Sequence, residues 1–154
     1  MAANGRRYSI FGQRACAAAA PQHIINLTAT AAVRPFIYDI LIGSSATPAD
    51  NAILWQAQRN TASGTGTTST APTAIDSGDP AITTTSTQNH TTDPTTTANT
   101  VLWYLALNQR ASHRWIADPN GTLIAPATAN NGIGLWLNHA SFTGNCNALF
   151  HLGE

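Results

Sequence analysis

The stretch AAVRPFIYDILIGSSATPADNAILWQAQR, residues 31–59, holds two runs of alternating side chains joined by a polar link. The first run, RPFIYDILIG at 34–43, is apolar on one face and nearly so on the other, which predicts a strand in the middle of a sheet. The link at 43–50 is dense in turn residues. In the second run, AILWQAQR at 52–59, polar residues recur at spacing two, so we favour a strand; a short helix capped by Asp50 is the alternative.

Strand patterns continue on both sides of this stretch. The run VLWYLALN at 101–108 is apolar on both faces and predicts another central strand. The sequence DPNG at 118–121 predicts a type I turn. The short run at 15–20 is compatible with a helical turn or an extended segment. The remaining predicted strands cover residues 7–13, 23–30, 113–116, 122–126, 133–139 and 146–152.

These patterns predict an all-β protein with about eight or nine strands and no long helix. The expected architecture is an antiparallel β-sandwich, and a jelly roll is the form that we favour. The 154 residues fit a single domain, 1–154.

A Thr-rich segment at 61–100 interrupts the strand patterns. It has few large apolar residues, a composition typical of disorder, but threonine also tolerates extended structure. Pro72, Pro80 and Pro94 argue against long strands here. We expect extended, irregular pieces that become ordered against the rest of the domain or against a partner chain.

Charge is sparse, at 9% of residues against about 25% in a typical soluble domain. The net charge is zero, so we expect neither nucleic acid nor an anionic membrane as a partner. A surface of hydroxyl and amide side chains suits a protein that is packed against other proteins. We expect no signal peptide and no transmembrane span.

No catalytic, cofactor-binding or metal-binding residues are predicted, and the protein is expected not to be an enzyme. The five histidines have no metal-ligand spacing, although His139 and His151 fall in neighbouring predicted strands. Asp76, Asp79 and Asp93 could surround a calcium ion, but turn formation explains them better.

The two cysteines, Cys16 and Cys146, are far apart in the sequence and fit no metal spacing. Because nothing marks the chain as secreted, we favour two reduced thiols over a disulfide between terminal strands.

Arginine and tryptophan are enriched at protein–protein hot spots, and several of each lie close together in the chain. An aromatic platform for sugar stacking at Trp55 or Trp115 is an alternative role for these side chains. The residues expected to contact a partner are Arg34, Trp55, Arg59, Arg110, Arg114 and Trp115.

Four phrases carry a resemblance to a known class of proteins. They are RYSIFG at 7–12, TATAAVRPFIYDILIGSSATPADNAILWQAQRNTASGTGT at 28–67, AIDSGDPA at 74–81, and the closing stretch from Trp136 onward. Together they resemble capsid cement or decoration proteins, small structural proteins of tailed-bacteriophage heads. The resemblance transfers no site residues.

The resemblance implies a homotrimeric jelly roll on the capsid exterior that bridges neighbouring major capsid subunits after synthesis in the host cytoplasm. Residues 1–6 and 61–100 are then candidates for segments that lie across the seam between subunits. Three alternatives stay open: a tail, baseplate or head-fibre component, a carbohydrate-binding β-sandwich, and a hydrolase.

Overall fold

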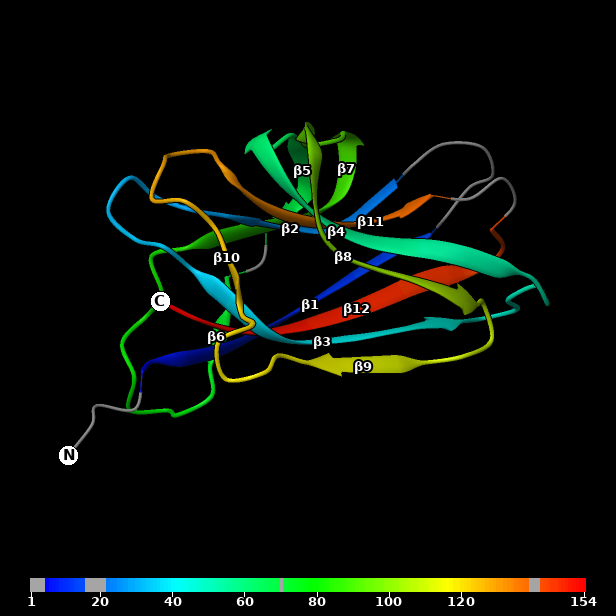
Figure 1. Ribbon diagram of the computed structural model, residues 1–154, viewed down its shortest axis with the longest axis horizontal. Helices are drawn as coiled ribbons and strands as arrows, with labels where there is room; N and C mark the ends of the chain where they lie inside the picture. The colour runs from blue at the N-terminus through cyan, green and yellow to red at the C-terminus, as the bar shows by residue number, and fades with distance from the viewer. Residues whose placement is uncertain (1–4, 16–21, 70, 139–141) are drawn as a thin grey trace.

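In the computed structural model, residues 5–15, 22–69, 71–138 and 142–154 are described, and they form twelve strands in two antiparallel sheets (Figure 1). The predicted all-β antiparallel sandwich is therefore confirmed, with more strands than the eight or nine expected. The described part of the chain contains no helix able to cross a membrane.

Sheet A has the order β10-β3-β12-β1-β6, and β9 also pairs with β3. Its interior strands are long because side chains that face the core alternate with side chains that face solvent along the whole of each strand. Its strands are β1 (Arg7–Ala15), β3 (Phe36–Ser45), β6 (Thr73–Ala74), β9 (His113–Ile116), β10 (Leu123–Ile124) and β12 (Asn145–Gly153).

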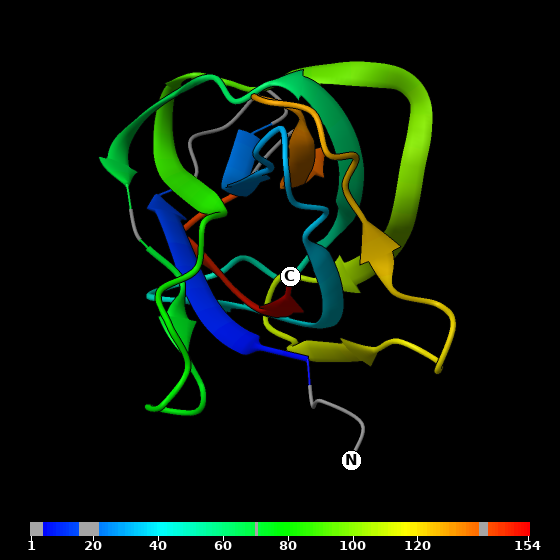
Figure 2. The same cartoon turned by 90° about the vertical axis from the view of Figure 1, so that its left-hand side faces the viewer.

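Sheet B has the order β5-β7-β2-β11-β4-β8. Figure 2, an end-on view, shows that the sheet is strongly curled and that β8 descends along one flank of the sandwich toward β9. Its strands are β2 (Gln22–Thr28), β4 (Ala52–Ala62), β5 (Thr65–Ser69), β7 (Thr85–Thr92), β8 (Thr95–Asn108) and β11 (Gly132–Asn138).

The strand pairs are nested along the chain. The first strand pairs with the last, β2 pairs with β11, β3 pairs with β9 and β10, and β4 pairs with β8, all antiparallel. The chain thus resembles one long hairpin whose two arms are rolled into two layers.

The stretch 31–59 contributes one strand to each layer. Its first run forms β3 in the interior of sheet A, as predicted, and its second forms β4, which confirms the strand over the helix. The two strands are not hydrogen-bonded to each other. They face one another across the core, where Ile40 and Ile42 of β3 and Ile53 and Trp55 of β4 are buried.

One expectation about strands was wrong, and another was met only in part. The run 101–108 belongs to β8, which is an edge strand of sheet B and not a central one. The Thr-rich segment is extended and ordered against the rest of the domain, as expected, but its pieces are the regular strands β5, β6, β7 and the start of β8. Pro72 and Pro94 directly precede β6 and β8, positions at which a proline costs no ladder hydrogen bond.

Candidate interaction surface

Three apolar side chains form a row across the solvent-facing side of sheet A. Phe11 of β1 is the register partner of Leu149 of β12, and Leu149 is the partner of Leu41 of β3. Phe11 and Leu41 are 59% and 42% exposed. We call these three residues the apolar row. The outer face of an antiparallel sheet is usually polar, so the row is an exposed apolar feature on a rigid support.

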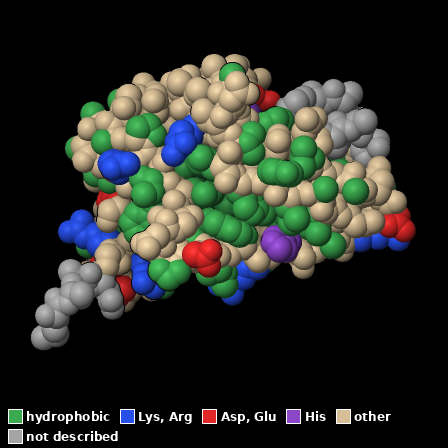
Figure 3. Space-filling model, in the orientation of Figure 1, with side chains coloured by type: hydrophobic (Ala, Val, Ile, Leu, Met, Phe, Trp, Pro, Cys, Tyr) green, Lys and Arg blue, Asp and Glu red, His purple; other side chains and the backbone are tan. Residues whose placement is uncertain are grey.

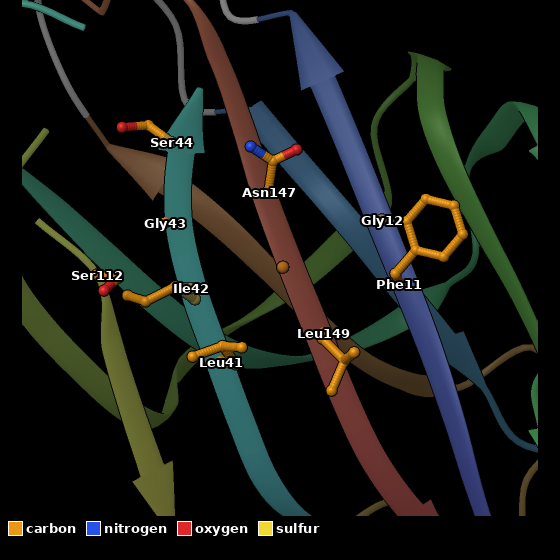
Figure 4. Close-up of a pocket in the computed structure, with 10 residues that line it drawn as sticks. Phe11, Gly12, Leu41, Ile42, Gly43, Ser44, Ser112, Asn147 and Leu149 are labelled. Carbon is orange, nitrogen blue, oxygen red and sulfur yellow. The ribbon is translucent and has the colours of Figure 1, made fainter. Parts of the chain in front are cut away.

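A groove of about 360 Å³ lies beside the apolar row. Figure 4 shows Phe11, Leu149 and Leu41 along it, with Asn147 and Ser44 further up the same strands. Gly43 lies between Asn147 of β12 and the β8–β9 link, and a β-carbon there would only reach van der Waals contact with Ser112. The missing side chain at Gly43 therefore helps to keep the groove open.

Next to the apolar row, Arg114 of β9 is held by a buried carboxylate. Arg114 is the register partner of Leu41, and its Nε and Nη2 donate to Asp39 Oδ1 and Oδ2 at 3.0 and 2.6 Å. His151 Nδ1 lies 2.8 Å from Asp39 Oδ2. Asp39 is only 3% exposed, whereas the guanidinium group of Arg114 faces solvent. The bidentate pair thus fixes the direction of an exposed cation.

The hydrogen bonds from Arg114 hold the pKa of Asp39 below its usual range, and the hydrogen bond with His151 adds to this. The same pair raises the pKa of Arg114. Tyr38 stacks on His151 with ring centroids 6.0 Å apart, and the Arg7 guanidinium lies 5.4 Å from the Tyr38 ring centroid. Contacts within the protein therefore hold the side chains around Asp39 in place before any partner binds.

On the same sheet, a serine, a histidine and an aspartate lie at paired positions of the adjacent strands β1, β12 and β3. Ser9 is the register partner of His151, and His151 is the partner of Asp39. Of these described side chains, only His151 and Asp39 are joined by a hydrogen bond. A nucleophilic serine is activated by hydrogen bonding to its base, and the structure shows no such bond between Ser9 and His151.

Of the six expected contact residues, the structure corrects Trp55, and it places Trp115 on the inner side of its strand. Trp55 is 1% exposed and packs in the core, so its ring is not available to a partner or to a sugar. Trp115 is the register partner of Ile40, on the inner side of β9, and is half-buried against the core. Their position near arginines in the sequence did not reflect the face on which they lie.

The four arginines are spread over the molecule. Arg34 is exposed ahead of β3, and Arg59 Nη2 donates to the Ile124 carbonyl oxygen at 3.3 Å. Arg110 is exposed, 3.8 Å from Asp50. Only Arg114 lies beside the apolar row. The three residues of that row were missed, because their common face depends on strand register and not on local sequence.

A second cluster of ionisable groups lies between β1 of sheet A and the interior strands β2 and β7 of sheet B. Arg14 Nη1 donates to Asp93 Oδ1 at 2.8 Å, and His23 Nδ1 lies 3.7 Å from the same oxygen. The His23 and His90 ring centroids are 6.1 Å apart. Burial lowers the pKa of His90 to about 4. Burial raises the pKa of Asp93, but the nearby His23 ring and the hydrogen bond from Arg14 outweigh it and lower the pKa of Asp93 to about 2.

Among the described residues, no group of three or more His, Cys, Asp or Glu side chains is arranged to hold a metal ion. Asp76 accepts hydrogen bonds from Gly78 and Asp79 within one turn, whereas Asp93 pairs with Arg14, so the three aspartates considered for calcium have separate roles. Cys146 is buried. Cys16, His139 and most of the segments 1–6 and 15–20 lie outside the described residues.

No protein-family model matches this chain, and comparisons with curated proteins and with solved structures also found no match.

Proposed function

We propose that the chain is a non-enzymatic structural protein of a phage virion, which binds the outside of the capsid and cements neighbouring major capsid subunits. The observation that carries the proposal is the apolar row of Phe11, Leu149 and Leu41 next to the fixed guanidinium of Arg114. Phenylalanine and arginine are among the residue types enriched at protein–protein interfaces, and here both lie on one exposed face.

The physical properties of this face support a docking role. Each residue of the apolar row is on a strand that is paired on both sides, so little conformational entropy is lost when a partner covers the row. The guanidinium is already oriented by Asp39 and can meet a carboxylate or backbone carbonyl oxygens of the shell. Few charges must be stripped of water, because charged residues make up only 9% of the chain.

The finer parts of the proposal follow from the resemblance and from the strand order. We take the fold to be a jelly roll, which is supported by the nested pairs and by the strand orders β1-β12-β3-β9 and β2-β11-β4-β8. The protein would act as a homotrimer on the virion exterior, with the major capsid protein as its partner. The Thr-rich segment is part of both sheets, so it is no longer our candidate for a seam-crossing arm.

Co-sedimentation with shells tests the proposal. Wild-type protein is expected to pellet with shells assembled from the major capsid protein of the same phage, and not with unassembled subunits. The double variant Phe11→Ser/Leu41→Ser should lose at least about tenfold in affinity, since hot-spot truncations commonly cost 2 kcal/mol or more. Ile75 is an apolar side chain on another part of the surface and is 54% exposed, so the Ile75→Ser variant should bind normally. A wild-type protein that ignores assembled shells would refute the proposal.

Two other functions give different results in simple experiments. A tail, baseplate or head-fibre component would be placed away from the capsid surface by immunogold labelling of virions. A carbohydrate-binding role can no longer use Trp55, but the Phe11 ring and the Asn147 amide line one groove, and the Asn147 oxygen accepts a hydrogen bond from Gln13 Nε2. A glycan-array signal that Phe11→Ala abolishes would favour this second candidate.

A further inference from the structure

The guanidinium group of Arg114 is held in place, but most of its hydrogen-bond donors are unused. A guanidinium group has five N–H donors. Nε and Nη2 of Arg114 donate to the Asp39 carboxylate at 3.0 and 2.6 Å, which uses two of them. Among the described residues, no acceptor takes the other three, and the Arg114 side chain is 55% exposed. Arg114 therefore presents the Nη1 and Nη2 end of its guanidinium group to solvent in a fixed direction.

Exposed apolar side chains lie on two sides of this guanidinium group. Leu41, its register partner on β3, is 42% exposed, and Ile116, two residues further along β9 on the same face, is 62% exposed. A partner that covers these side chains also removes water from Arg114. A buried donor without an acceptor is unfavourable, so the partner must place a hydrogen-bond acceptor there.

The exposed charge on this face of sheet A is positive. Asp39 is the only acidic residue in β1, β3, β9 and β12, and it is buried beneath Arg114. Arg7 of β1 is exposed, lies over the Tyr38 ring and forms no ion pair with the described residues. Two exposed arginines thus accompany one buried carboxylate, and an acidic group on the partner complements this charge.

A carboxylate on a protein suits this surface better than the phosphates of a nucleic acid. Nucleic acids are bound by patches or stripes of basic residues. The seven arginines of this chain are balanced by seven acidic residues, and Figure 3 shows basic side chains lying apart from one another on the face that it draws. A phosphate group also has no apolar surface to place on the apolar row.

Arg114 and the apolar row lie on one line across four strands. Arg114 pairs in register with Leu41, Leu41 with Leu149, and Leu149 with Phe11. Neighbouring strands are about 4.8 Å apart, so the line is about 14 Å long. An extended segment rises about 3.3 Å per residue and has alternate side chains on one face. A segment of about five residues is therefore long enough to contact Arg114 with one side chain and the apolar row with two others.

We infer that the partner places an aspartate or glutamate side chain on Arg114 and apolar side chains of the same segment on the apolar row. The inference rests on the proposed function and names the chemistry of the capsid segment that the surface recognises. The partner's carboxylate accepts hydrogen bonds from Nη1 and Nη2 of Arg114, while Nε and Nη2 keep their bonds to Asp39. Because Asp39 already fixes the guanidinium group, little side-chain entropy is lost on binding.

Co-sedimentation with shells of the same phage tests the contact. Arg114→Gln alone would leave Asp39 buried without its partner, so the cation is removed in the double variant Asp39→Asn/Arg114→Gln. The reference is Asp39→Asn, which keeps the cation. The double variant should bind shells at least about tenfold more weakly than Asp39→Asn. Arg34→Gln removes an exposed arginine elsewhere and should bind like wild-type protein, and urea unfolding verifies that each variant is folded.

A cross-linking experiment detects the partner's carboxylate directly, because the chain contains no lysine. The variant Asp39→Asn/Arg114→Lys has one side-chain amine, placed beside the apolar row, and lacks the internal carboxylate that would compete for it. A carbodiimide joins an amine to a carboxylate that it contacts. Mass spectrometry should find position 114 joined to an aspartate or glutamate of the major capsid protein. The control Asp39→Asn/Arg34→Lys should give no such product.

The outcomes separate the acidic contact from the proposed function. Wild-type protein that does not pellet with shells refutes both. If wild-type protein pellets but Asp39→Asn and the double variant bind equally well, the acidic contact is refuted and the capsid role stands. The absence of any link from position 114 to the shell has the same meaning. A link from position 114 to an acid of a second copy, formed without shells, would assign the surface to a contact between copies and overturn the inference too.

Discussion

Gly12 of β1 lies directly against Ile25 of β2, at a point where the two sheets approach closely. A β-carbon on Gly12 would come within 2.8 Å of the Ile25 β-carbon and 3.0 Å of the Ile24 carbonyl oxygen. The backbone of sheet A thus packs on sheet B with no side chain between them. The absence of a side chain on Gly12 sets the spacing of the layers beneath Phe11.

Replacing Gly12 with alanine should therefore destabilise the protein. The added methyl group meets a β-carbon and a backbone oxygen that cannot move without shifting β2, and such overpacking costs about 1–3 kcal/mol. Urea unfolding would measure the loss. Gly5→Ala is the matched control, because a β-carbon at Gly5 has no atom within 4 Å. Equal midpoints for the two variants would contradict the close approach.

Asp39→Asn should weaken both the fold and the order of the candidate surface. The amide cannot accept the bidentate bond from Arg114 and the bond from His151 as a carboxylate does, and hydrogen bonds to charged groups contribute about 1.5–3 kcal/mol. Because the Asp39 pKa is lowered in the folded state, its contribution is present above the unfolded pKa and is lost as pH falls through the folded value. Unfolding at pH 7 measures the effect. Asp118→Asn, at an exposed position, should be neutral.

The strands with large alternating apolar residues were predictable from sequence, and β7 was not. Its inward positions are Ser86 and Gln88, followed by the buried His90, all polar and all buried. The Gln88 side chain accepts a hydrogen bond from the Gln13 backbone amide of β1 at 2.7 Å. A polar residue buried through a partner 75 positions away leaves no local hydrophobic pattern, so the Thr-rich segment looked irregular.

The site was less predictable than the fold, for a related reason. The apolar run of β8 was interpreted as a central strand because both of its faces are apolar. Such a pattern indicates that both faces of the strand are buried against other surfaces. It does not indicate whether those surfaces belong to the same chain. Similarly, Phe11, Leu41 and Leu149 become one row only through the pairing of β1, β12 and β3.

Trp55→Ala should be strongly destabilising, as expected of a core residue and not of a contact residue. The side chain is fully buried among the two sheets, and removing a buried tryptophan costs about 3–5 kcal/mol. The unfolding midpoint in urea measures this. Phe11→Ala removes an exposed aromatic ring and should change stability by about 0.5 kcal/mol or less. A Trp55→Ala variant as stable as the Phe11→Ala variant would contradict the burial of Trp55 in the core.

His90 should make the protein lose stability in mild acid. Its pKa is about 4 in the folded protein, against about 6.5 in an unfolded chain, because burial and the nearby charges of His23 and Arg14 disfavour the imidazolium while Asp93 partly offsets them. The stabilising contribution is full above pH 6.5 and is lost as pH falls toward 4, since only the unfolded state then takes up the proton. Asp93, with a pKa of about 2, loses its own contribution lower, from about pH 3.8 downward.

Urea midpoints measured from pH 7 to pH 4.5 should therefore decline for wild-type protein and decline less for His90→Gln. The glutamine keeps a polar group near the Thr87 hydroxyl, which lies 2.9 Å from His90 Nε2, but does not titrate in this range. Thr92→Ser, a change that does not titrate at an exposed position on the same strand, serves as the control and should keep the wild-type slope. Parallel pH profiles for His90→Gln and wild type would show that the buried cluster of Arg14, His23, His90 and Asp93 does not control acid stability.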